Sequence, residues 1–331
     1  MSLLLWVLCA SWVSYSVSSE PLFDLENAEL HFERFIEEHS RMYADEYEKQ
    51  ARFLIFKDNL EQANHLNEKH DLADFGITKF MDLTTEEFLK SHTGLNVGVS
   101  DYTADCSYMT DADIPDGDAP ETFDWRQLNA VTPVKDQKYC GSCYAFSSIG
   151  NIESQYAIKY KEHLDLSEQQ IVDCDKRNWA CSGGFMSSPL IFFKVSNSEA
   201  DYPYVTQSGE CKFDANKVRV KVADCHSFNL TSQEKVKQHL HQNGPISIAI
   251  QAAGLQYYSG GIIDDAACNV GDINHAVLLV GYGNENGVPY WIVKNSWGGS
   301  WCEEGYFRMS RGESIHSCGM MNDLMATSVI A

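Results

Sequence analysis

A cysteine, a histidine and an asparagine stand in an order and at spacings that suit nucleophilic catalysis. Cys143 lies in the run Cys140-Gly-Ser-Cys143-Tyr144, His275 follows 132 residues later, and Asn295 lies 20 residues beyond it. A thiol attacks as its thiolate, which a histidine partner and a helix N-terminus both favour. The Asn295 carbonyl can fix the imidazole tautomer without adding charge. Gln137 can direct an amide N–H at an oxyanion, beside the backbone N–H of Cys143. These residues predict covalent catalysis by Cys143, with His275 as its proton partner.

Two other interpretations of these residues carry less weight. Cys140 and Cys143 have the Cys-x-x-Cys spacing of a thioredoxin-like redox pair, but no strand–helix–strand unit surrounds them. A lone histidine is more often structural than catalytic, and we interpret the following as structural or surface residues: His163, His226, His239, His241 and His316. No His-Glu-x-x-His or paired Cys-x-x-Cys pattern appears, so neither a metal site nor a cofactor is expected.

The elements that must position these residues change in type along the chain. Residues 142–159 predict a long helix with Cys143 at its start, and Ser167 with Gln170 predicts a capping box that opens a second helix. Alternating and apolar runs later predict strands at 246–250, 276–280, 290–294 and 305–308. Helices first and strands later favour an α+β fold built from two packed halves.

Composition and charge limit the compartment and the partners. The 331 residues hold 25 Lys and Arg against 47 Asp and Glu, a net charge of −22 that makes nucleic acid and anionic membranes poor partners. Eleven cysteines favour an oxidising compartment. Residues 1–19 predict a secretory signal cut near Ser18 or Ser19, although a basic n-region is missing. A short membrane anchor is the alternative, and no later stretch is long and apolar enough to span a membrane.

The region between this signal and the cysteine-rich part has its own character. Residues 24–90 are highly charged, lack cysteine and carry large apolar residues at helical spacing: Phe32, Phe35, Ile36, Tyr43, Tyr47, Phe53, Phe56 and Leu60. The polar stretch that follows, residues 91–119, has the composition of a linker. We expect a protease to cut it near Asp113–Ala119 without disturbing a core.

Taken together, the chain resembles a papain-family cysteine protease precursor of the cathepsin L/F-like branch that includes the viral cathepsins. Besides the catalytic blocks, four stretches are similar to the family's: Asp124-Trp-Arg126, Pro133-Val-Lys-Asp-Gln137, Cys181-Ser-Gly-Gly184 and Tyr290-Trp-Ile-Val-Lys-Asn-Ser-Trp297. The N-terminal part resembles the family's inhibitory pro-domain, with Ala63 where Ile is commoner and Thr78 where Asn is usual. The matching positions are Glu48, Arg52, Phe56, Asn59, Asn67, Gly76, Phe80 and Asp82.

The resemblance implies a papain-like two-domain fold, with a helical left domain and a β-barrel-like right domain behind a mainly helical pro-domain. Its segments are a signal peptide (1–19), an inhibitory pro-domain (20–90, here called the pro-region), a linker or activation segment (91–118) and the protease domain (119–331). It further implies three disulfides: Cys140–Cys181, Cys174–Cys211 and Cys268–Cys318. Cys106, Cys225 and Cys302 remain, and a fourth bond between Cys225 and Cys302 is a further hypothesis.

Within the protease domain, three residues depart from the family's pattern. Tyr144 stands where Trp is common, and Lys138 and Cys302 stand where Gly is usual. The substitutions at 138 and 144 remove no reacting group, so we expect altered tuning and retained activity.

The resemblance also assigns the substrate site. Gly183 and Gly184 let an extended substrate backbone approach. An apolar second specificity pocket favours Leu, Val or Phe and has Asp323 at its floor, where a carboxylate would also accept Arg. The residues assigned to this site are Phe185, Met186, Ala249, Ile273, Ala276, Asp323 and Trp297. The expected partners are peptide substrates, the chain's own pro-region and cystatin-like inhibitors.

Two further expectations concern mode of action and modification. No His-rich insertion lies near Cys181 or Gly183 to block the cleft, which favours an endopeptidase over an exopeptidase. Asn229 begins the one N-x-[ST] sequon and is a candidate glycosylation site. A protein secreted along this route would reach an acidic, lysosome-like compartment or the exterior. The alternative function is a secreted homologue that inhibits or binds other proteases through its pro-region.

Overall fold

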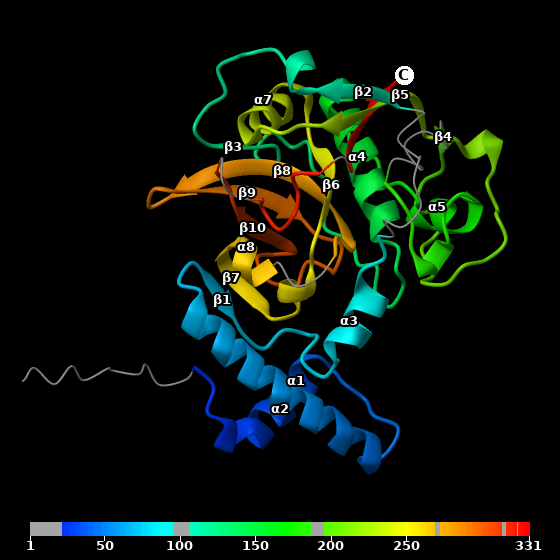
Figure 1. Ribbon diagram of the computed structural model, residues 1–331. Helices are drawn as coiled ribbons and strands as arrows, with labels where there is room; N and C mark the ends of the chain where they lie inside the picture. Colours follow the sequence, from blue (N-terminus) through cyan, green and yellow to red (C-terminus); the bar gives the residue numbers. More distant parts are fainter. Residues whose placement is uncertain (1–21, 96–105, 187–194, 269–271, 313–315, 323) are drawn as a thin grey trace, which may run out of the picture.

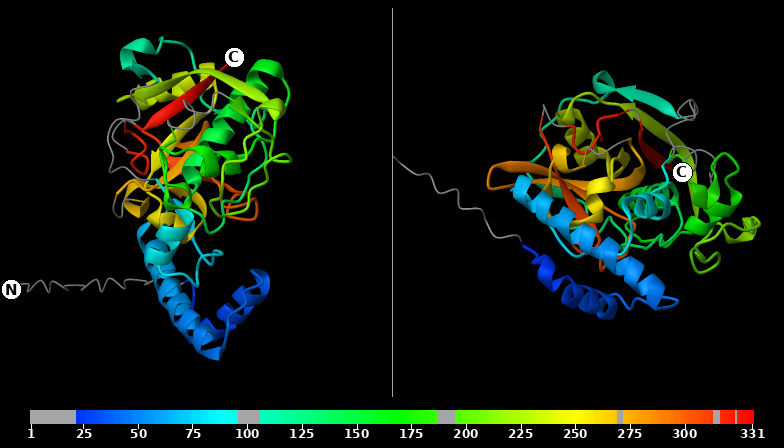
Figure 2. Two further views of the ribbon diagram at one scale, coloured as in Figure 1. Left: turned by 90° about the vertical axis from the view of Figure 1, so that its right-hand side faces the viewer. Right: turned by 60° about the horizontal axis from the view of Figure 1, so that its bottom comes forward.

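The computed structural model describes residues 22–95, 106–186, 195–268, 272–312, 316–322 and 324–331, so the expected signal peptide lies outside the described residues. Figure 1 shows helices α1 and α2 at one end, a twisted sheet in the middle and helices α4 and α5 beside the sheet. Figure 2 shows from two other directions that α1 and α2 project as a separate layer below the main body. In the described residues, no helix combines the length and the apolar composition needed to cross a membrane.

The pro-region is mainly helical, as expected. Its elements are α1 (Ala28–Glu38), α2 (Glu46–Lys69), β1 (Ala73–Phe75) and α3 (Thr85–His92). Asp45 caps α2, and Thr84 with Glu87 forms a capping box on α3, which fixes where both helices begin. The two long helices pack through aromatic rings, because Phe32 and Phe35 lie 5.3 and 5.2 Å from the ring of Phe56.

The helical half of the main body is built on one buried helix. α4 (Cys143–Tyr160) begins one residue later than predicted, and α5 (Glu168–Cys174) follows. Ser167 caps α5 by accepting from the Gln170 N–H. The predicted capping box is incomplete, because the Gln170 side chain instead bonds the backbone of Val195 and Asn197.

The described strands form one sheet whose path is β1-β7-β10-β9-β8-β6-β11-β5-β2, with β3 beside β8 and β4 beside β5. The protease-side strands include all four predicted ones, and α7 (Gln233–Asn243) and α8 (Asp265–Cys268) accompany them. Their bounds are Phe123–Asp124 (β3), Val195–Ser196 (β4), Val220–Asn229 (β5), Ile246–Ile250 (β6), Tyr258–Ile263 (β7), His275–Glu285 (β8), Val288–Lys294 (β9), Tyr306–Ser310 (β10) and Met325–Ile330 (β11).

Both edges of this sheet are covered by segments that precede the protease domain. β1 of the pro-region pairs antiparallel with β7 at one edge. At the other edge β2 (Ser107–Thr110), from the expected linker, pairs in parallel with β5. Added strands of this kind satisfy backbone groups that an edge strand otherwise leaves unpaired.

Candidate active site

Three elements bring Cys143, His275 and Asn295 to one place. Cys143 is the first residue of α4, His275 is the first of β8, and Asn295 directly follows β9. Because β8 and β9 run antiparallel, the start of one strand meets the end of the other. α4 lies against β8, where Ser147 Oγ donates a 2.7 Å hydrogen bond to the Val277 carbonyl.

His275 is held in a defined orientation. Its Nε2 lies 2.8 Å from Asn295 Oδ1, which accepts hydrogen bonds only, so Nε2 carries the proton. Its Nδ1 is buried and has no hydrogen-bond partner among the described residues. The Trp297 ring stacks on the imidazole with 4.8 Å between centroids and encloses it. Nδ1 is therefore the nitrogen left free to accept a proton from a thiol.

Both titrating groups are fully buried. Burial raises the pKa of the Cys143 thiol to about 12, against the lowering effect of the backbone N–H groups of Ala276, Tyr144 and Cys143 itself. Burial also lowers the pKa of His275 to about 4, against the raising effect of its bond to Asn295. In this state the thiol and the imidazole are both neutral at pH 7, because desolvation disfavours each charged form.

The Gln137 amide is fixed beside the thiol-bearing helix. Gln137 Nε2 donates to the Cys140 carbonyl at 3.0 Å, and Oε1 accepts from Ser296 Oγ at 2.6 Å. A primary amide has two N–H donors, so one remains for a ligand in the cleft. The backbone N–H of Cys143, at the start of α4, supplies a second donor of the same kind.

The structure shows the backbone conformation and contacts of the three residues that depart from the family's pattern. Lys138 and Cys302 have φ of 51° and 46°, the left-handed region in which glycine is strain-free. The usual glycines thus match the backbone, and this chain carries side chains there at some cost in strain. Tyr144 is fully buried, and its hydroxyl donates to the Ala180 carbonyl at 3.1 Å.

Thr93, Gly94 and Leu95, here called the cleft segment, lie beside these residues, where the papain-like fold is expected to have its substrate cleft. The N–H groups of Gly94 and Leu95 donate to the Asn274 carbonyl at 3.1 and 2.9 Å, and Gly184 N–H donates to the Gly94 carbonyl at 2.8 Å. A Cβ on Gly94 would lie 2.2 Å from the Gly141 carbonyl oxygen, so only glycine fits there. The cleft segment therefore occupies the backbone groups expected to receive a substrate.

The residues assigned to the second specificity pocket are only partly gathered. Met186, Ala249 and Ala276 are buried in one hydrophobic cluster that also contains Cys143 and Leu95, and Ile273 packs against it. Phe185 lies outside that cluster, with its ring 6.2 Å from Trp179. Asp323, the expected floor, lies outside the described residues.

The pro-region docks on Trp297 through its second motif. The rings of Phe80 and Phe88 lie 5.2 and 5.3 Å from Trp297, both edge to face. Lys79 Nζ donates to the Trp297 carbonyl at 2.6 Å and pairs with Asp136 at 3.3 Å. The indole Nε1–H of Trp297 donates to the His92 carbonyl at 2.9 Å, which ties α3 to the site.

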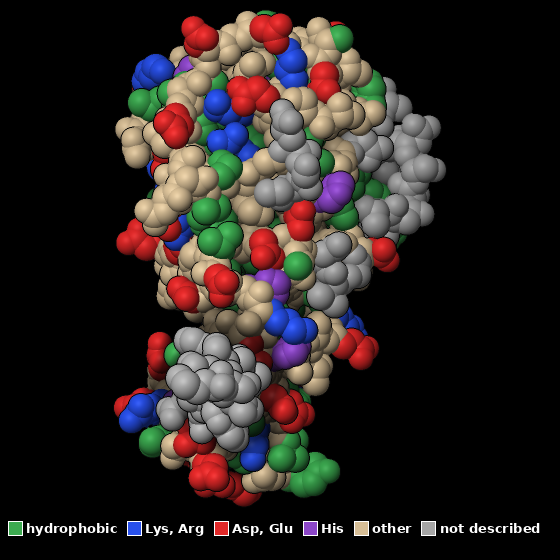
Figure 3. Space-filling view, turned by 60° about the vertical axis from the view of Figure 1, so that its left-hand side comes forward, with side chains coloured by type: hydrophobic (Ala, Val, Ile, Leu, Met, Phe, Trp, Pro, Cys, Tyr) green, Lys and Arg blue, Asp and Glu red, His purple; other side chains and the backbone are tan. Residues whose placement is uncertain are grey.

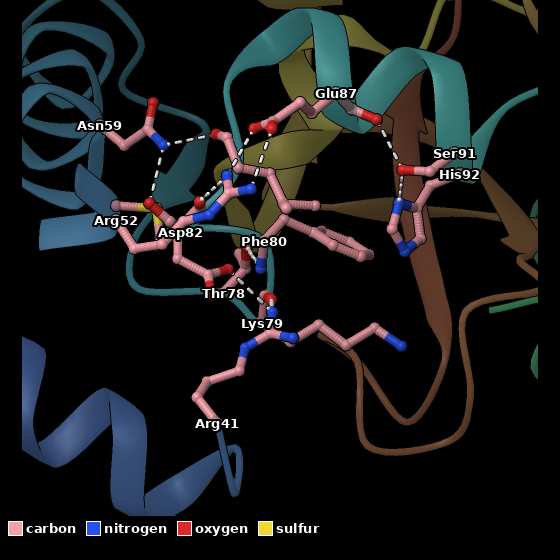
Figure 4. A network of polar contacts seen from close by, with 12 residues as sticks. Arg41, Arg52, Asn59, Thr78, Lys79, Phe80, Asp82, Glu87, Ser91 and His92 are labelled. Atoms are coloured by element: carbon pink, nitrogen blue, oxygen red, sulfur yellow. Dashed lines mark hydrogen bonds and ion pairs between the residues drawn. The ribbon is translucent and has the colours of Figure 1, made fainter. Parts of the chain in front are cut away.

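Figure 4 shows polar contacts that hold residues 78–84, the loop before α3, and α3 itself to α2 and to the segment that follows α1. Arg52 forms a bidentate salt bridge with Glu87, with N–O distances of 2.7 and 3.0 Å. Arg41 forms a salt bridge with Asp82 at 2.9 Å. Asn59 Nδ2 donates to the Met81 and Leu83 carbonyls at 2.8 and 2.9 Å. The motif positions on α2 thus fix the loop that carries Phe80.

The implied disulfides are present, and the fourth one differs from the hypothesis. The structure contains the bonds Cys140–Cys181, Cys174–Cys211 and Cys268–Cys318. The hypothesis of a Cys225–Cys302 bond was wrong, because Cys225 in β5 is bonded to Cys106, the residue before β2. Among the described cysteines, Cys143 and Cys302 are free thiols.

Sequence reasoning missed a buried ionic cluster next to Asn295. Lys135 Nζ lies 2.9 Å from both Glu153 and Glu168, whose side chains are only 1% and 2% exposed. Lys294 Nζ donates to Thr132 at 3.1 Å, and burial lowers the pKa of this lysine to about 8. The two lysines, the two glutamates and Asn295 line a cavity of about 20 Å³, room for about one water molecule. Charged helix positions ordinarily face solvent, so the sequence carries no signal for this cluster.

Comparisons with known proteins agree with this architecture. The papain family cysteine protease model matches residues 119–328, and the cathepsin propeptide inhibitor domain model matches residues 32–88. A viral cathepsin of Heliothis zea nuclear polyhedrosis virus is 39% identical over 99% of this chain and 95% of its own. A viral cathepsin of Spodoptera litura multicapsid nucleopolyhedrovirus is 42% identical over 95% of each.

A solved structure has the same architecture along nearly its whole length. Digestive procathepsin L2 from Tenebrio molitor larval midgut superposes with a TM-score of 0.84 at 33% identity, covering 91% of this chain and 99% of its own. In the described residues no cluster of three or more His, Cys, Asp or Glu is placed to hold a metal ion. The chain belongs to the papain family of cysteine proteases, as a zymogen in which a cathepsin propeptide inhibitor domain precedes the protease domain.

Proposed function

We propose that this zymogen yields a cysteine endopeptidase that cleaves peptide bonds through Cys143, His275, Asn295 and Gln137. The observation that carries the proposal is the His275–Asn295 hydrogen bond, which leaves Nδ1 free, while the Cys143 thiol at the start of α4 interacts with the backbone N–H of Ala276, the next residue after His275. A base oriented by a third group is the arrangement that activates a nucleophile.

The reaction follows from these groups. Cys143 Sγ attacks the substrate carbonyl carbon while His275 holds the thiol proton, and the oxyanion accepts hydrogen bonds from Cys143 N–H and Gln137 Nε2–H. The C–N bond breaks as the imidazolium protonates the leaving amine, which leaves a thioester on Cys143. Water, deprotonated by His275, then hydrolyses the thioester and restores the thiol.

The test is to find which thiol reacts in processed protein. After acid activation, an epoxysuccinyl thiol-protease probe is added, the modified peptide is located by mass spectrometry, and peptide cleavage is assayed in parallel. We expect one label, on Cys143, and loss of cleavage in proportion to labelling. Fully processed, folded protein that takes no label and blocks another cysteine protease would instead support the inhibitor alternative.

The secretory route is part of the same proposal. It rests on the signal-like residues 1–19, on four disulfides and on Asn229, which is exposed at the end of β5 as a glycan acceptor must be. The destination is an acidic lysosome-like compartment or the exterior. Figure 3 shows, on one face, Asp and Glu side chains on both the main body and the pro-region below it. Because acid protonates such carboxylates, a fall in pH is a natural trigger for release of the pro-region.

Protonation of Glu87 would destabilise the pro-region, which is the direction that such a trigger requires. Its hydrogen bonds from Arg52 hold the pKa of this carboxylate below its ordinary value, so it stabilises the docked pro-region at neutral pH. That stabilisation is lost as pH falls through the lowered pKa. Protonation of Asp82 acts in the opposite direction. Burial raises the pKa of this carboxyl group, so protonation removes the cost of keeping a buried charge.

Glu87→Gln should therefore raise the pH at which the pro-region opens. Its partly exposed pair with Arg52 is worth about 0.5–1 kcal/mol, so we expect a shift of a few tenths of a pH unit. Tryptophan fluorescence against pH, in precursor carrying Cys143→Ala, measures it because Trp297 lies at the docking surface. Glu86→Gln, which removes the same charge one residue away, is the control and should leave the midpoint unchanged; equal midpoints for both variants would contradict the assignment.

Substrate selectivity at the second pocket gives a further prediction. If Asp323 forms the floor, Asp323→Ala should lower cleavage of an Arg-Arg substrate about 10-fold relative to a Phe-Arg substrate, because it removes a charge-assisted partner. The ratio of kcat/KM values for the two substrates measures this. An unchanged ratio would mean that the carboxylate does not contact the substrate.

A further inference from the structure

The expected linker is covalently bonded to the protease domain. Cys106, before β2, forms a disulfide with Cys225 in β5, and both cysteines are buried. From Ser107 to Thr110 the chain then runs parallel to β5 in register with residues 226–229. We call residues 106–118 the strap.

The strap is anchored well beyond its disulfide. Ile114 is 2% exposed and belongs to the main hydrophobic core. Asp111 accepts from the N–H and hydroxyl of Thr231 at 3.1 and 2.5 Å. Lys235 Nζ donates to the Ile114 carbonyl at 2.8 Å and pairs with Asp116 at 2.7 Å. These partners lie in the protease domain, so the strap packs as part of that domain.

The strap is also remote from the inhibitory contacts. Figures 1 and 2 show β2 beside β5 at the end of the molecule opposite α1 and α2. The two family models stop at residue 88 and begin at residue 119, so neither covers the strap. Removing it would expose Ile114 and the edge of β5, whereas removing the pro-region leaves these contacts untouched.

Bond connectivity limits where a releasing cut can fall. Hydrolysis of a peptide bond between residues 107 and 118 adds one water and creates a carboxylate and an amine, but leaves the sulfur–sulfur bond intact. The pro-region would then remain bonded through Cys106 to Cys225. A cut near Asp113–Ala119, as the linker composition favours, therefore nicks the chain without freeing the pro-region.

We propose, as an extension of the proposed function, that the strap is a retained part of the active protease. The cut that frees the pro-region falls on the N-terminal side of Cys106, and the Cys106–Cys225 bond persists in the processed enzyme. The exposed segment Pro115–Asp118 tolerates nicking, but a cut there cannot by itself yield free enzyme.

The first test needs no catalytic activity. Full-length precursor carrying Cys143→Ala receives a recognition site for a sequence-specific protease in place of residues 115–118, is cut there, and is denatured with free thiols blocked. We expect the two pieces to migrate together on a non-reducing gel and to separate after dithiothreitol. The matched Cys106→Ser, Cys225→Ser double variant should separate without reductant. Separation of the disulfide-competent protein without reductant would overturn the proposal.

The second test uses unmodified sequence, so it does not depend on how the variants fold. Precursor is activated in acid, where thiolates are scarce and disulfide exchange is slow, and free thiols are then blocked. N-terminal sequencing and non-reduced peptide mapping should find the active species starting at or before Cys106, with a peptide pair joined through Cys106 and Cys225. Active enzyme without Cys106 would overturn the proposal. Inactive processed protein would count against the proposed function alone, since the gel test still reports on the strap.

Discussion

Replacing Cys143 by Ala should lower peptide cleavage by the processed protein by about 10⁴- to 10⁶-fold, because it removes the thiol proposed to form the acyl intermediate. Removing the nucleophile of a catalytic unit leaves only the acceleration due to binding and oxyanion contacts. The measurement is kcat/KM on a peptide substrate, with precursor processed by an added protease so that loss of self-processing does not mimic loss of chemistry.

Cys302→Ser is the matched control for this experiment. Cys302 is the other free thiol among the described residues, but burial raises its pKa to about 12 and its hydrogen-bonding neighbour is Tyr258. We expect this variant to keep activity within about 2-fold of wild type. Retained activity in Cys143→Ala, or loss in Cys302→Ser alone, would place the nucleophile elsewhere.

The places of Cys143, His275 and Asn295 in the fold were largely predictable because they depend on local patterns. The helix at residues 142–159 and the strands at 276–280 and 290–294 are each strongly patterned, and their observed bounds put Cys143, His275 and Asn295 at the ends of elements. Residues at element ends meet when those elements are neighbours. The pro-region motifs were informative for the same reason, since their spacing keeps them on one side of α2.

What the sequence did not reveal depends on long-range packing. The cleft segment is a short run around Gly94 with no periodicity, and only its contact with Gly141 and Gly184 explains why glycine stands there. The partner of Cys225 could not be chosen from spacing, because pairing with Cys106 closes a 119-residue separation. Lys135 is likewise explained only by the two buried carboxylates that surround it.

The strap and the cleft segment divide the expected linker into parts with different roles. Residues 93–95 block the cleft through backbone contacts to Asn274 and Gly184. Residues 106–118 belong to the protease domain by their disulfide and their buried Ile114. One polar stretch thus carries both the end of the inhibitor and an edge of the enzyme, which composition alone cannot separate.

Burial of the thiol in the precursor leads to the second large expected effect. Burial raises the pKa of the Cys143 thiol to about 12, so at pH 7 it is almost wholly protonated, whereas an ordinary cysteine is thiolate in a few per cent of molecules. Removing the pro-region readmits water to the cleft, which removes the desolvation that raised this pKa and lowered that of His275. The helix N-terminus and a protonated His275 then favour the thiolate.

Alkylation of Cys143 by iodoacetamide should therefore be at least about 10³-fold faster in processed enzyme than in precursor at pH 7. The rate is measured by mass spectrometry in a Cys302→Ser background, which removes the other described free thiol. The pH dependence separates charge from simple access. In precursor the rate should rise about tenfold per pH unit while the pro-region stays docked, whereas in processed enzyme it should persist down to pH 5. Parallel profiles in the two forms would mean that the pro-region blocks entry without changing the ionisation of Cys143.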